Sequence, residues 1–575
     1  MSRLRTPFLA VLGGALPALA LPLVVPWISP REIDPAGHLE WIAWVGLVPA
    51  LLALDAAQGW KRAFGLGLAA GLAYAYLAIY WVSHAMTAFG GLSQGLAFVA
   101  LSLLVLYMAF HWGLAFAVSY LVRRRLGWPL HLHLPFVWAA TELLRDVLFT
   151  GFPWGNLGYL QARHLAVSQL AALLGIYAIA ALVVLANCAV HAVVRAGLDG
   201  RPFPWRPVAA SLGLAAATVA YGEVHLATVR ARMAAAPELV VGLVQANVNQ
   251  LLKNEASSHA DYILGRLWPL TVQADRAGAD LVAWPEAAYP FYASPEQRSF
   301  AVRGSGLEPL GRAHLLLGAA TLAWRVEGGR RAAEITNSVF LLHPDLSVAA
   351  RYAKYHLVPF GEYVPLAGWL PPFIRQVVPD LAPARAGRKL QVMRFPLPPP
   401  APTSTATSTP TSTPAAPPTP PDQTSFAPMI CFDAIFPEIN LAYAKEDPEF
   451  LINPTNDAWY GHSSGPYQFL AIVRLRAIEA GKAVARPAYS GVSAIVLPTG
   501  EIAPGALEVG PVEGDRSPDP SEPARLLLGK LPRLHGGTLY TSIGDLFAFG
   551  CAGWAVIALG MALKRGRAAG ASQQG

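Results

Sequence analysis

The stretch LAVSQLAALLGIYAIAALVVLANCAVHAVV, residues 165–194, decides the fold class, because it contains no Asp, Glu, Lys or Arg. A helix rises about 1.5 Å per residue, so about 20 apolar residues cross the roughly 30 Å hydrocarbon core of a bilayer. This stretch therefore predicts a membrane-spanning helix. Seven other long and mainly apolar stretches have the same character; they are 7–29, 39–57, 62–85, 91–121, 131–148, 207–224 and 539–563.

The first apolar stretch, 7–29, has two interpretations. Arg3 and Arg5 precede it, and Ala18-Leu19-Ala20 resembles the cleavage site of a secretory signal peptide. The apolar run nevertheless continues without a break to Trp27. This continuity favours a retained membrane helix over a cleaved peptide.

The distribution of charge separates the chain into two environments. Only 14% of the 575 residues are charged, 54% are hydrophobic and the mean hydropathy is +0.39, whereas soluble domains carry about 25% charged residues. Residues 1–225 hold 21 of the 79 charged residues, and residues 226–538 hold 54. These values exclude a purely cytosolic globular enzyme. They predict an α-helical bundle of about eight transmembrane helices, from 1–225 and 539–563, a polar domain at 226–538 and a short cytoplasmic tail at 564–575.

Basic residues predict the orientation of this bundle. Lys and Arg are retained in the cytoplasmic loops next to membrane helices. A cytoplasmic N-terminus places 13 of them on the inner side, and only Arg31, Arg145 and Arg163 on the outer side. Seven crossings then place residues 226–538 outside the cytoplasm, and the eighth returns the tail to it.

The exported region carries no excess of positive charge. Residues 226–538 contain 27 Lys and Arg against 27 Asp and Glu, so the net charge of +7 belongs to the membrane part and the tail. A nucleic-acid-binding domain needs a basic face on the surface that binds. We therefore expect no nucleic-acid partner.

The three cysteines differ in their expected surroundings. Cys188 and Cys551 lie inside predicted membrane helices, where a small apolar side chain is the simplest explanation. Cys431 is alone in the exported region. Structural cysteines in an oxidising compartment usually occur in pairs. A single cysteine there favours a reactive nucleophile over an inert core thiol.

The exported region alternates short apolar segments with amphipathic ones. Strands interleaved with helices predict an α/β layered fold. The stretch from Pro398 to Thr424 is almost entirely Pro, Thr, Ser and Ala, and it predicts a disordered surface insertion within the domain. Strands are expected at 239–244, 280–284, 314–322, 338–342, 427–431, 450–453 and 493–497, and helices at 257–277 and 467–481.

An acidic and a basic residue stand at or near predicted strand ends. Glu286 follows Trp284-Pro285, at an edge where open α/β sheets bind ligands, and a carboxylate there suits a general base. Its alternative role is a surface cap of the next helix. Lys354 lies among apolar and aromatic residues, with Glu362 eight residues later, and supplies a fixed positive charge for an oxyanion. Its alternative role is that of a surface lysine whose stem packs on apolar neighbours.

Cys431 completes a set of three chemical types. It lies in Ile430-Cys431-Phe432-Asp433 at the predicted end of a strand. A cysteine nucleophile needs a base to take its proton and a donor to hold the oxyanion. Glu286 and Lys354 are residues of those two types. Each motif is weak by itself, but in the order Glu, Lys, Cys the three form a set that suits a cysteine nucleophile.

These residues resemble the nitrilase superfamily, and with the membrane helices they resemble its apolipoprotein N-acyltransferase family. One departure is Phe432-Asp433, where that family usually has Tyr-Glu, and another is Asn254 after Lys253, where it commonly has Trp. The segments that carry the resemblance are Trp284-Pro285-Glu286, Lys354–Pro365 (KYHLVPFGEYVP), Cys431, Asn456-Asp457-Ala458-Trp459, Gly151-Phe152-Pro153-Trp154, Gly158-Tyr159, Tyr80-Trp81-Val82-Ser83, Val244-Gln245-Ala246-Asn247, Gly465-Pro466, Gln468, Arg476-Ala477-Ile478-Glu479, Thr538-Leu539-Tyr540 and Gly544-Asp545.

The resemblance implies a fold, a reaction and partners. It implies an αββα sandwich of nitrilase type on the periplasmic side of the bacterial inner membrane. Glu286, Lys354 and Cys431 would form the catalytic triad, which takes an acyl chain from a phospholipid and passes it, through a thioester, to the amine of a diacylated lipoprotein. No metal or cofactor is implied, and we expect a monomer. Supporting or substrate-binding roles fall to Glu362, Phe432, Asp433, Trp459, Tyr80 and Trp154.

Two other functions remain open from the sequence. In a membrane-anchored nitrilase-type amidohydrolase, water rather than an amine would resolve the thioester. A transporter or scaffold would need charged residues along its membrane helices, and Glu142, Arg145 and Asp146 are the candidates, with a helix-end ion pair as their simpler explanation. Tyr80, Trp81 and Trp154 fit either the aromatic belt of a membrane interface or a lateral portal for lipid.

Overall fold

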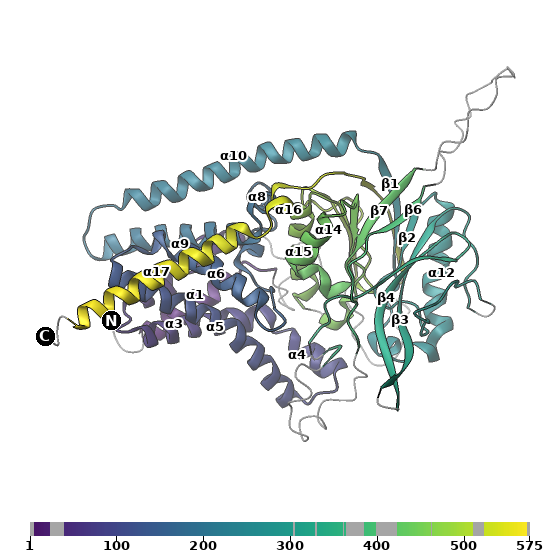
Figure 1. Ribbon diagram of the computed structural model, residues 1–575, viewed down its shortest axis with the longest axis horizontal. Coiled ribbons are helices and arrows are strands. Elements are labelled where there is room, and N and C mark those ends of the chain that lie inside the picture. The colour runs from purple at the N-terminus through teal and green to yellow at the C-terminus, as the bar shows by residue number, and fades with distance from the viewer. Residues whose placement is uncertain are drawn as a thin grey trace, which may run out of the picture.

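The chain consists of a helical bundle with an α/β domain at one end of it (Figure 1). The computed structural model of the chain describes residues 5–22, 39–302, 305–327, 330–359, 361–363, 384–397, 422–461, 463–509 and 523–571. Of the predicted insertion at 398–424, the last three residues lie within these ranges. Gln423 and Thr424 begin a strand, so the predicted disorder is wrong for them, and the rest of the insertion falls outside the described residues.

Five described helices are long and apolar enough to cross a membrane. They are α3 (Trp60–Ile79), α5 (Gln94–Leu126), α9 (Ile176–Leu198), α10 (Trp205–Ala235) and the segment Leu546–Gly566 of α17 (Leu546–Ala571). The helix expected at 207–224 continues to Ala235. The other predicted stretches contain shorter helices, namely α1 (Arg5–Ala18), α2 (Val48–Asp55) and α6 (Leu134–Val147). The membrane-helical class of the first part of the chain is thereby confirmed.

The stretch at 165–194 is not one helix but three. Short helices α7 (Leu165–Ser168) and α8 (Leu170–Leu174) precede α9. Gly175 separates α8 from α9 with a φ of 75°, which favours glycine. A Cβ at this position would lie 2.5 Å from the ring of Tyr540. The helix is therefore interrupted at Gly175, where the ring of Tyr540, from the segment before α17, packs against the backbone.

The α/β domain is a sandwich of two six-stranded sheets. The first sheet has the order β12 (Arg525–Pro532), β1 (Glu238–Gln245), β2 (Leu281–Ala283), β3 (His314–Glu327), β4 (Arg330–Leu342), β5 (Val348–Ala353). The second has the order β11 (Leu507–Val509), β10 (Gly491–Val496), β9 (Val484–Arg486), β8 (Phe450–Ile452), β7 (Gln423–Pro428), β6 (Met393–Pro396).

Helices cover the outer faces of this sandwich (Figure 1). Helix α12 (Ala260–Arg276) packs on the first sheet. Helices α14 (Pro437–Ala444) and α15 (Gly465–Ala480) lie on the second sheet, on the side toward the bundle. The predicted αββα layering is therefore confirmed. The central pairs are parallel, namely β1–β2 and β2–β3 in the first sheet and β7–β8 and β8–β9 in the second. The carboxyl ends of these strands therefore meet at one edge of each sheet.

The bundle and the α/β domain share one hydrophobic core. The largest cluster of buried apolar residues runs from Trp112 in α5 through Trp154 and Phe469 of α15 to Ala485 of β9. The N-terminal start of α1 and the C-terminal end of α17 lie at the end of the bundle far from the α/β domain (Figure 1). Helix α10 runs from the bundle almost directly into β1, with only residues 236 and 237 between them.

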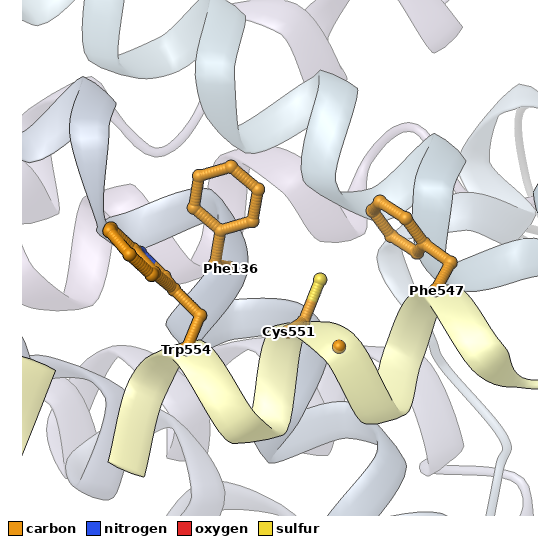
Figure 2. A pocket seen from close by; sticks show the side chains of 5 residues that line it. Phe136, Phe547, Cys551 and Trp554 are labelled. Carbon is orange, nitrogen blue, oxygen red and sulfur yellow. The ribbon is translucent and has the colours of Figure 1, made fainter. Parts of the chain in front are cut away.

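An apolar groove of about 430 Å³ lies on the bundle between α6 and α17. Figure 2 shows Phe136 of α6 facing Phe547, Cys551 and Trp554 of α17 across it. The thiol of Cys551 is 3% exposed and belongs to this apolar lining. Cys551 thus fills the role of a small apolar residue in a membrane helix.

Candidate active site

Glu286 lies in a tight turn at the end of β2. Trp284 anchors the turn to α12, because its indole nitrogen donates a 2.8 Å hydrogen bond to Oγ1 of Thr271 in that helix. The turn passes so close to β3 that a Cβ on Gly318 would lie 2.1 Å from the Pro285 carbonyl oxygen. Ala287 adopts a φ of 46°, a left-handed conformation that costs a residue other than glycine about 1–2 kcal/mol. Glu286 is 6% exposed, which rules out a surface cap.

Lys354 follows β5 and points into the same space. Its ammonium nitrogen lies 3.0 Å from Glu286 Oε1 and 3.0 Å from a carboxylate oxygen of Glu362. The side-chain amide of Asn337 on β4 donates to both carboxylates, at 2.7 Å and 3.2 Å. Lys354 is 1% exposed, so it is not a surface lysine. Its amine is held between two carboxylates in a buried network.

Cys431 begins a single turn of 3-10 helix, Cys431–Ile435, after β7 ends at Pro428. Its backbone N–H donates to the carbonyl of Pro454 at 2.8 Å, and its carbonyl accepts from the side chain of Asn453 at 3.2 Å. These bonds hold Cys431 at a φ of 46°, another left-handed residue that is not glycine. Strain of this kind is typical of functional turns. The thiol is 6% exposed and forms no disulfide.

Asp433 stabilises the backbone before the thiol and the backbone of the segment after Lys354. Its carboxylate accepts hydrogen bonds from the N–H of His356 at 2.7 Å, the N–H of Ile430 at 3.0 Å and the hydroxyl of Tyr352 at 2.7 Å. Burial raises the pKa of Asp433 to about 6, against the effect of these donors. Asp433 therefore joins the segment after Lys354 to the turn of Cys431.

Electrostatics assign the proton to the thiol in the resting site. Burial raises the pKa of Glu286, but the ammonium groups of Lys354 and Lys253 outweigh it and lower that pKa below its ordinary value. Burial lowers the pKa of Lys354, but Glu286 and Glu362 raise it overall. Burial, followed by the charge of Glu286, raises the pKa of Cys431 to about 12. The resting site therefore contains a carboxylate, an ammonium and a neutral thiol.

The pH dependence of alkylation tests this protonation state. In a protein with Cys188→Ala and Cys551→Ala, the rate at which iodoacetamide modifies Cys431 should rise about tenfold per pH unit between about pH 6 and pH 9. The thiolate fraction increases by that factor at any pH well below the pKa. Intact mass at timed intervals measures the rate, and the added change Cys431→Ala is the blank. A plateau near neutral pH would instead indicate a resting thiolate.

The aromatic residues proposed as supporting groups lie between the bundle and the α/β domain. The indole nitrogens of Trp81 and Trp154 donate to the side-chain oxygen of Gln468 on α15, at 3.3 Å and 2.8 Å. Trp81 is 6% and Trp154 1% exposed, so the aromatic-belt interpretation is wrong for both. The Tyr80 hydroxyl lies 3.2 Å from Ser464 Oγ, and the Tyr80 side chain is partly exposed.

Phe432 and Trp459 complete the predicted residues around the thiol. The Phe432 ring lies 6.4 Å from that of Phe152, in the loop after α6, and 5.2 Å from that of Phe436. Trp459 is half-buried in the turn η7 (Asp457–Tyr460). The neighbouring Tyr460 ring lies 4.7 Å from that of Trp81. An apolar wall thus connects the Cys431 turn with the bundle.

The charged group of α6 is buried and includes the ion pair expected at the end of the helix, with Arg145 Nε 3.4 Å from Asp146 Oδ1. Arg145, Glu142 and Asp146 are at most 4% exposed. Glu142 Oε1 accepts from the Trp138 indole at 3.1 Å and from the backbone N–H of Leu157 at 3.0 Å. The group thereby fastens the loop that carries Trp154 onto α6, which is a structural role.

Sequence reasoning missed two polar residues of the site. Asn337 lies one residue before the predicted strand at 338–342, and no pattern distinguishes an amide inside a strand. Lys253 stood out only as the residue before a departure from the family pattern. Its ammonium donates to the backbone carbonyl of Glu286 at 2.8 Å. Both residues donate hydrogen bonds to Glu286, Asn337 to its carboxylate and Lys253 to its backbone carbonyl.

Comparison with known proteins identifies the class of the α/β domain. Residues 240–510 match the carbon-nitrogen hydrolase family, so this part of the chain is a carbon-nitrogen hydrolase domain. Residues 32–189 match the N-terminal domain of apolipoprotein N-acyltransferase. A solved structure of an amidase from Nesterenkonia AN1, a member of the nitrilase superfamily, is 17% identical, with a TM-score of 0.32, over 55% of this chain and 97% of that chain.

Relatives that span nearly the whole chain identify the family. The apolipoprotein N-acyltransferase of Geobacter metallireducens is 33% identical over 98% of this chain and 96% of the relative. That of Rhodopseudomonas palustris is 29% identical over 94% of this chain and 91% of the relative. This chain belongs to the apolipoprotein N-acyltransferase family.

Proposed function

We propose that this protein transfers an acyl chain from a phospholipid to the N-terminal amine of a diacylglyceryl-cysteine on an apolipoprotein. The observation that carries the proposal is a buried Cys431 beside a Lys354–Glu286 ion pair of 3.0 Å, at the junction with a membrane bundle. Such a site can activate a thiol and hold an oxyanion. The names of the relatives supply the acceptor class, and the membrane supplies the donor.

The first half of the reaction forms a thioester. Glu286 takes the thiol proton while Cys431 Sγ attacks the carbonyl carbon of the phospholipid ester. Since the resting thiol has a pKa of about 12, this proton transfer occurs together with the attack. The Lys354 ammonium stabilises the negative charge that develops on the carbonyl oxygen. Glu286 then gives its proton to the leaving alkoxide, and a lysophospholipid departs.

The second half of the reaction forms an amide. The amine of the acceptor attacks the thioester carbon, and Glu286 accepts a proton from it. Lys354 again stabilises the oxyanion. The Cys431 thiolate leaves and is reprotonated by Glu286, which restores the resting site. One ester bond is exchanged for one amide bond, and the kinetics are ping-pong.

We also propose how the molecule is oriented in the membrane. Basic residues gather at the end of the bundle far from the α/β domain: Arg123 and Arg195 pair with Asp55, and Arg125 donates to the carbonyl of Ala562 near the end of α17 at 3.4 Å. The positive-inside rule assigns this end to the cytoplasm. This orientation supports a periplasmic location for residues 226–538. We propose in addition that the protein acts as a monomer in the inner membrane.

An adduct experiment tests the proposed reaction. Purified protein in detergent receives phosphatidylethanolamine without an acceptor, and intact mass is recorded. We expect a gain of one fatty-acyl group on Cys431 that neutral hydroxylamine removes, and no gain in Cys431→Ala. A diacylglyceryl-cysteine peptide should then take up the acyl group as an amide.

The matched control is the same lipopeptide with an acetylated amine. It offers the same lipid anchor but no nucleophile, so the adduct should persist. Release of free fatty acid at equal rates with the free peptide, the blocked peptide and no peptide would identify a hydrolase instead. That result would refute the acyl-transfer proposal.

A further inference from the structure

The proposed reaction leaves one partly buried cation of the site without a role. Lys253 lies near the end of α11 (Gln250–Asn254), a short helix after β1. Its ammonium donates a 2.8 Å hydrogen bond to the backbone carbonyl of Glu286. A charged side chain from another part of the chain thus holds the main chain of the proposed base.

Two further contacts tie Lys253 to other loops of the site. The ammonium lies 4.1 Å from the centre of the Tyr489 ring, within the range of a cation–π interaction. With the Asn456 amide turned so that its oxygen faces the nearby donors, that oxygen accepts from Lys253 Nζ at 3.1 Å and from Trp459 Nε1 at 3.1 Å. An ammonium has three N–H donors, and these three contacts match that number.

We propose that Lys253 is a positioning residue for acyl transfer, whose ammonium ties the Glu286 turn to the Asn456–Trp459 segment and keeps the Glu286 carboxylate beside the Cys431 thiol. This inference rests on the acyl-transfer function proposed above. It concerns a residue that reaches the reaction only through Glu286.

The backbone at Glu286 explains why such a tie is needed. The peptide between Glu286 and Ala287 stands in an uncommon orientation, because Ala287 has a φ of 46°. A left-handed residue other than glycine persists only where its surroundings hold it. The hydrogen bond from Lys253 is made to the carbonyl of this peptide. Loss of the bond would let the peptide rotate and carry the Glu286 side chain with it.

The charge of Lys253 acts on the same carboxylate. Burial raises the pKa of Glu286, Lys354 lowers it most, and Lys253 lowers it further. Burial lowers the pKa of Lys253 itself to about 8, although Glu286 and Cys431 oppose this. Removal of the Lys253 charge therefore raises the pKa of Glu286. Among the described residues, the polar and titratable groups that face Glu286 are Lys253 from α11, Asn337 from β4, Lys354 after β5, Cys431 from the turn after β7 and Tyr460 from η7.

The test measures the rate of Cys431 acylation by phosphatidylethanolamine as a function of pH in the full-length protein. Lys253→Met removes the donors and the charge, and Lys253→Gln keeps a donor but removes the charge. Lys530→Met is the matched control, since Lys530 is an exposed lysine paired with Glu238 on the surface. Thermal unfolding of each protein is recorded in parallel.

We expect Lys253→Met to acylate about 10²-fold more slowly, the scale for a misplaced catalytic group. The acid limb of its pH profile should move to higher pH, because Glu286 then titrates at higher pH. Lys253→Gln should lose less rate and show the same shift, and it replaces Lys253→Met if that protein does not fold. Lys530→Met should match the wild type in rate and profile.

Two results would overturn the proposal. One is acylation by both Lys253 variants within about twofold of the wild type. The other is a slower rate with an unmoved acid limb, which would indicate a merely structural lysine. Failure of the wild type to form the adduct would count against the acyl-transfer function itself, and is thus distinct from a failure confined to the Lys253 variants.

Discussion

Glu286→Gln should slow the acylation of Cys431 by about 10² to 10⁴-fold, the range over which a positioned base contributes to a reaction. The amide keeps the shape of the side chain and its contact with Asn337, but it cannot take the thiol proton. Lys354 retains Glu362 as an ionic partner at 3.0 Å, so the protein should still fold. Intact mass of the adduct at timed intervals gives the rate constant.

Glu362→Gln is the matched control for the base. It makes the same chemical change on the other carboxylate that contacts Lys354. Because Glu286 remains ionised beside the thiol, the rate should fall by much less. Equal losses for the two variants, or acylation by Glu286→Gln within about tenfold of the wild type, would show that Glu286 is not the base.

Lys354→Met should slow acylation by about 10² to 10³-fold, the scale for loss of one donor to an oxyanion. Lys354→Arg should not restore the rate, since a planar guanidinium does not fit the space of a compact ammonium. Burst-phase measurement at saturating phospholipid separates this effect on chemistry from an effect on binding. An Arg variant within about tenfold of the wild type would remove Lys354 from the proposed role.

A folding defect needs a separate control in this case. Lys354→Met leaves the buried Glu286 and the partly buried Glu362 without their common cation, and an unpaired buried charge costs about 3–5 kcal/mol. The double change Lys354→Met and Glu362→Gln removes one of these charges. We expect it to regain unfolding temperature but not the acylation rate. Recovery of the rate would mean that Lys354 serves stability and not chemistry.

The elements that could be predicted from sequence are those with a strong local pattern. Long apolar stretches gave the membrane helices, and the amphipathic segment at 257–277 corresponds to α12. Strands β9 and β11 have three residues each, and β12 contains Gly529 and Lys530, so no local pattern marks them. They exist because neighbouring strands supply their hydrogen bonds.

The candidate site was predictable to the extent that chemistry depends on residue type. Glu286, Lys354 and Cys431 were singled out because a thiol needs a base and an oxyanion donor. Trp81 and Trp154 kept two interpretations, because a sequence does not tell whether an indole faces lipid or another part of the protein. The contact of Lys253 with a backbone carbonyl leaves no trace in a pattern of side chains.

The shared hydrophobic core has a consequence for how this kind of enzyme is inherited and handled. Phe469 and Leu470 of α15 are buried in the cluster that continues into the bundle. If the α/β domain were cut away after α10, this face would be exposed to water, and exposed apolar patches of that kind drive aggregation. We therefore expect that the α/β domain cannot be detached as a free-standing soluble protein. The helical bundle and the α/β domain depend on each other for solubility, so they must be extracted from the membrane, purified and mutated as one protein.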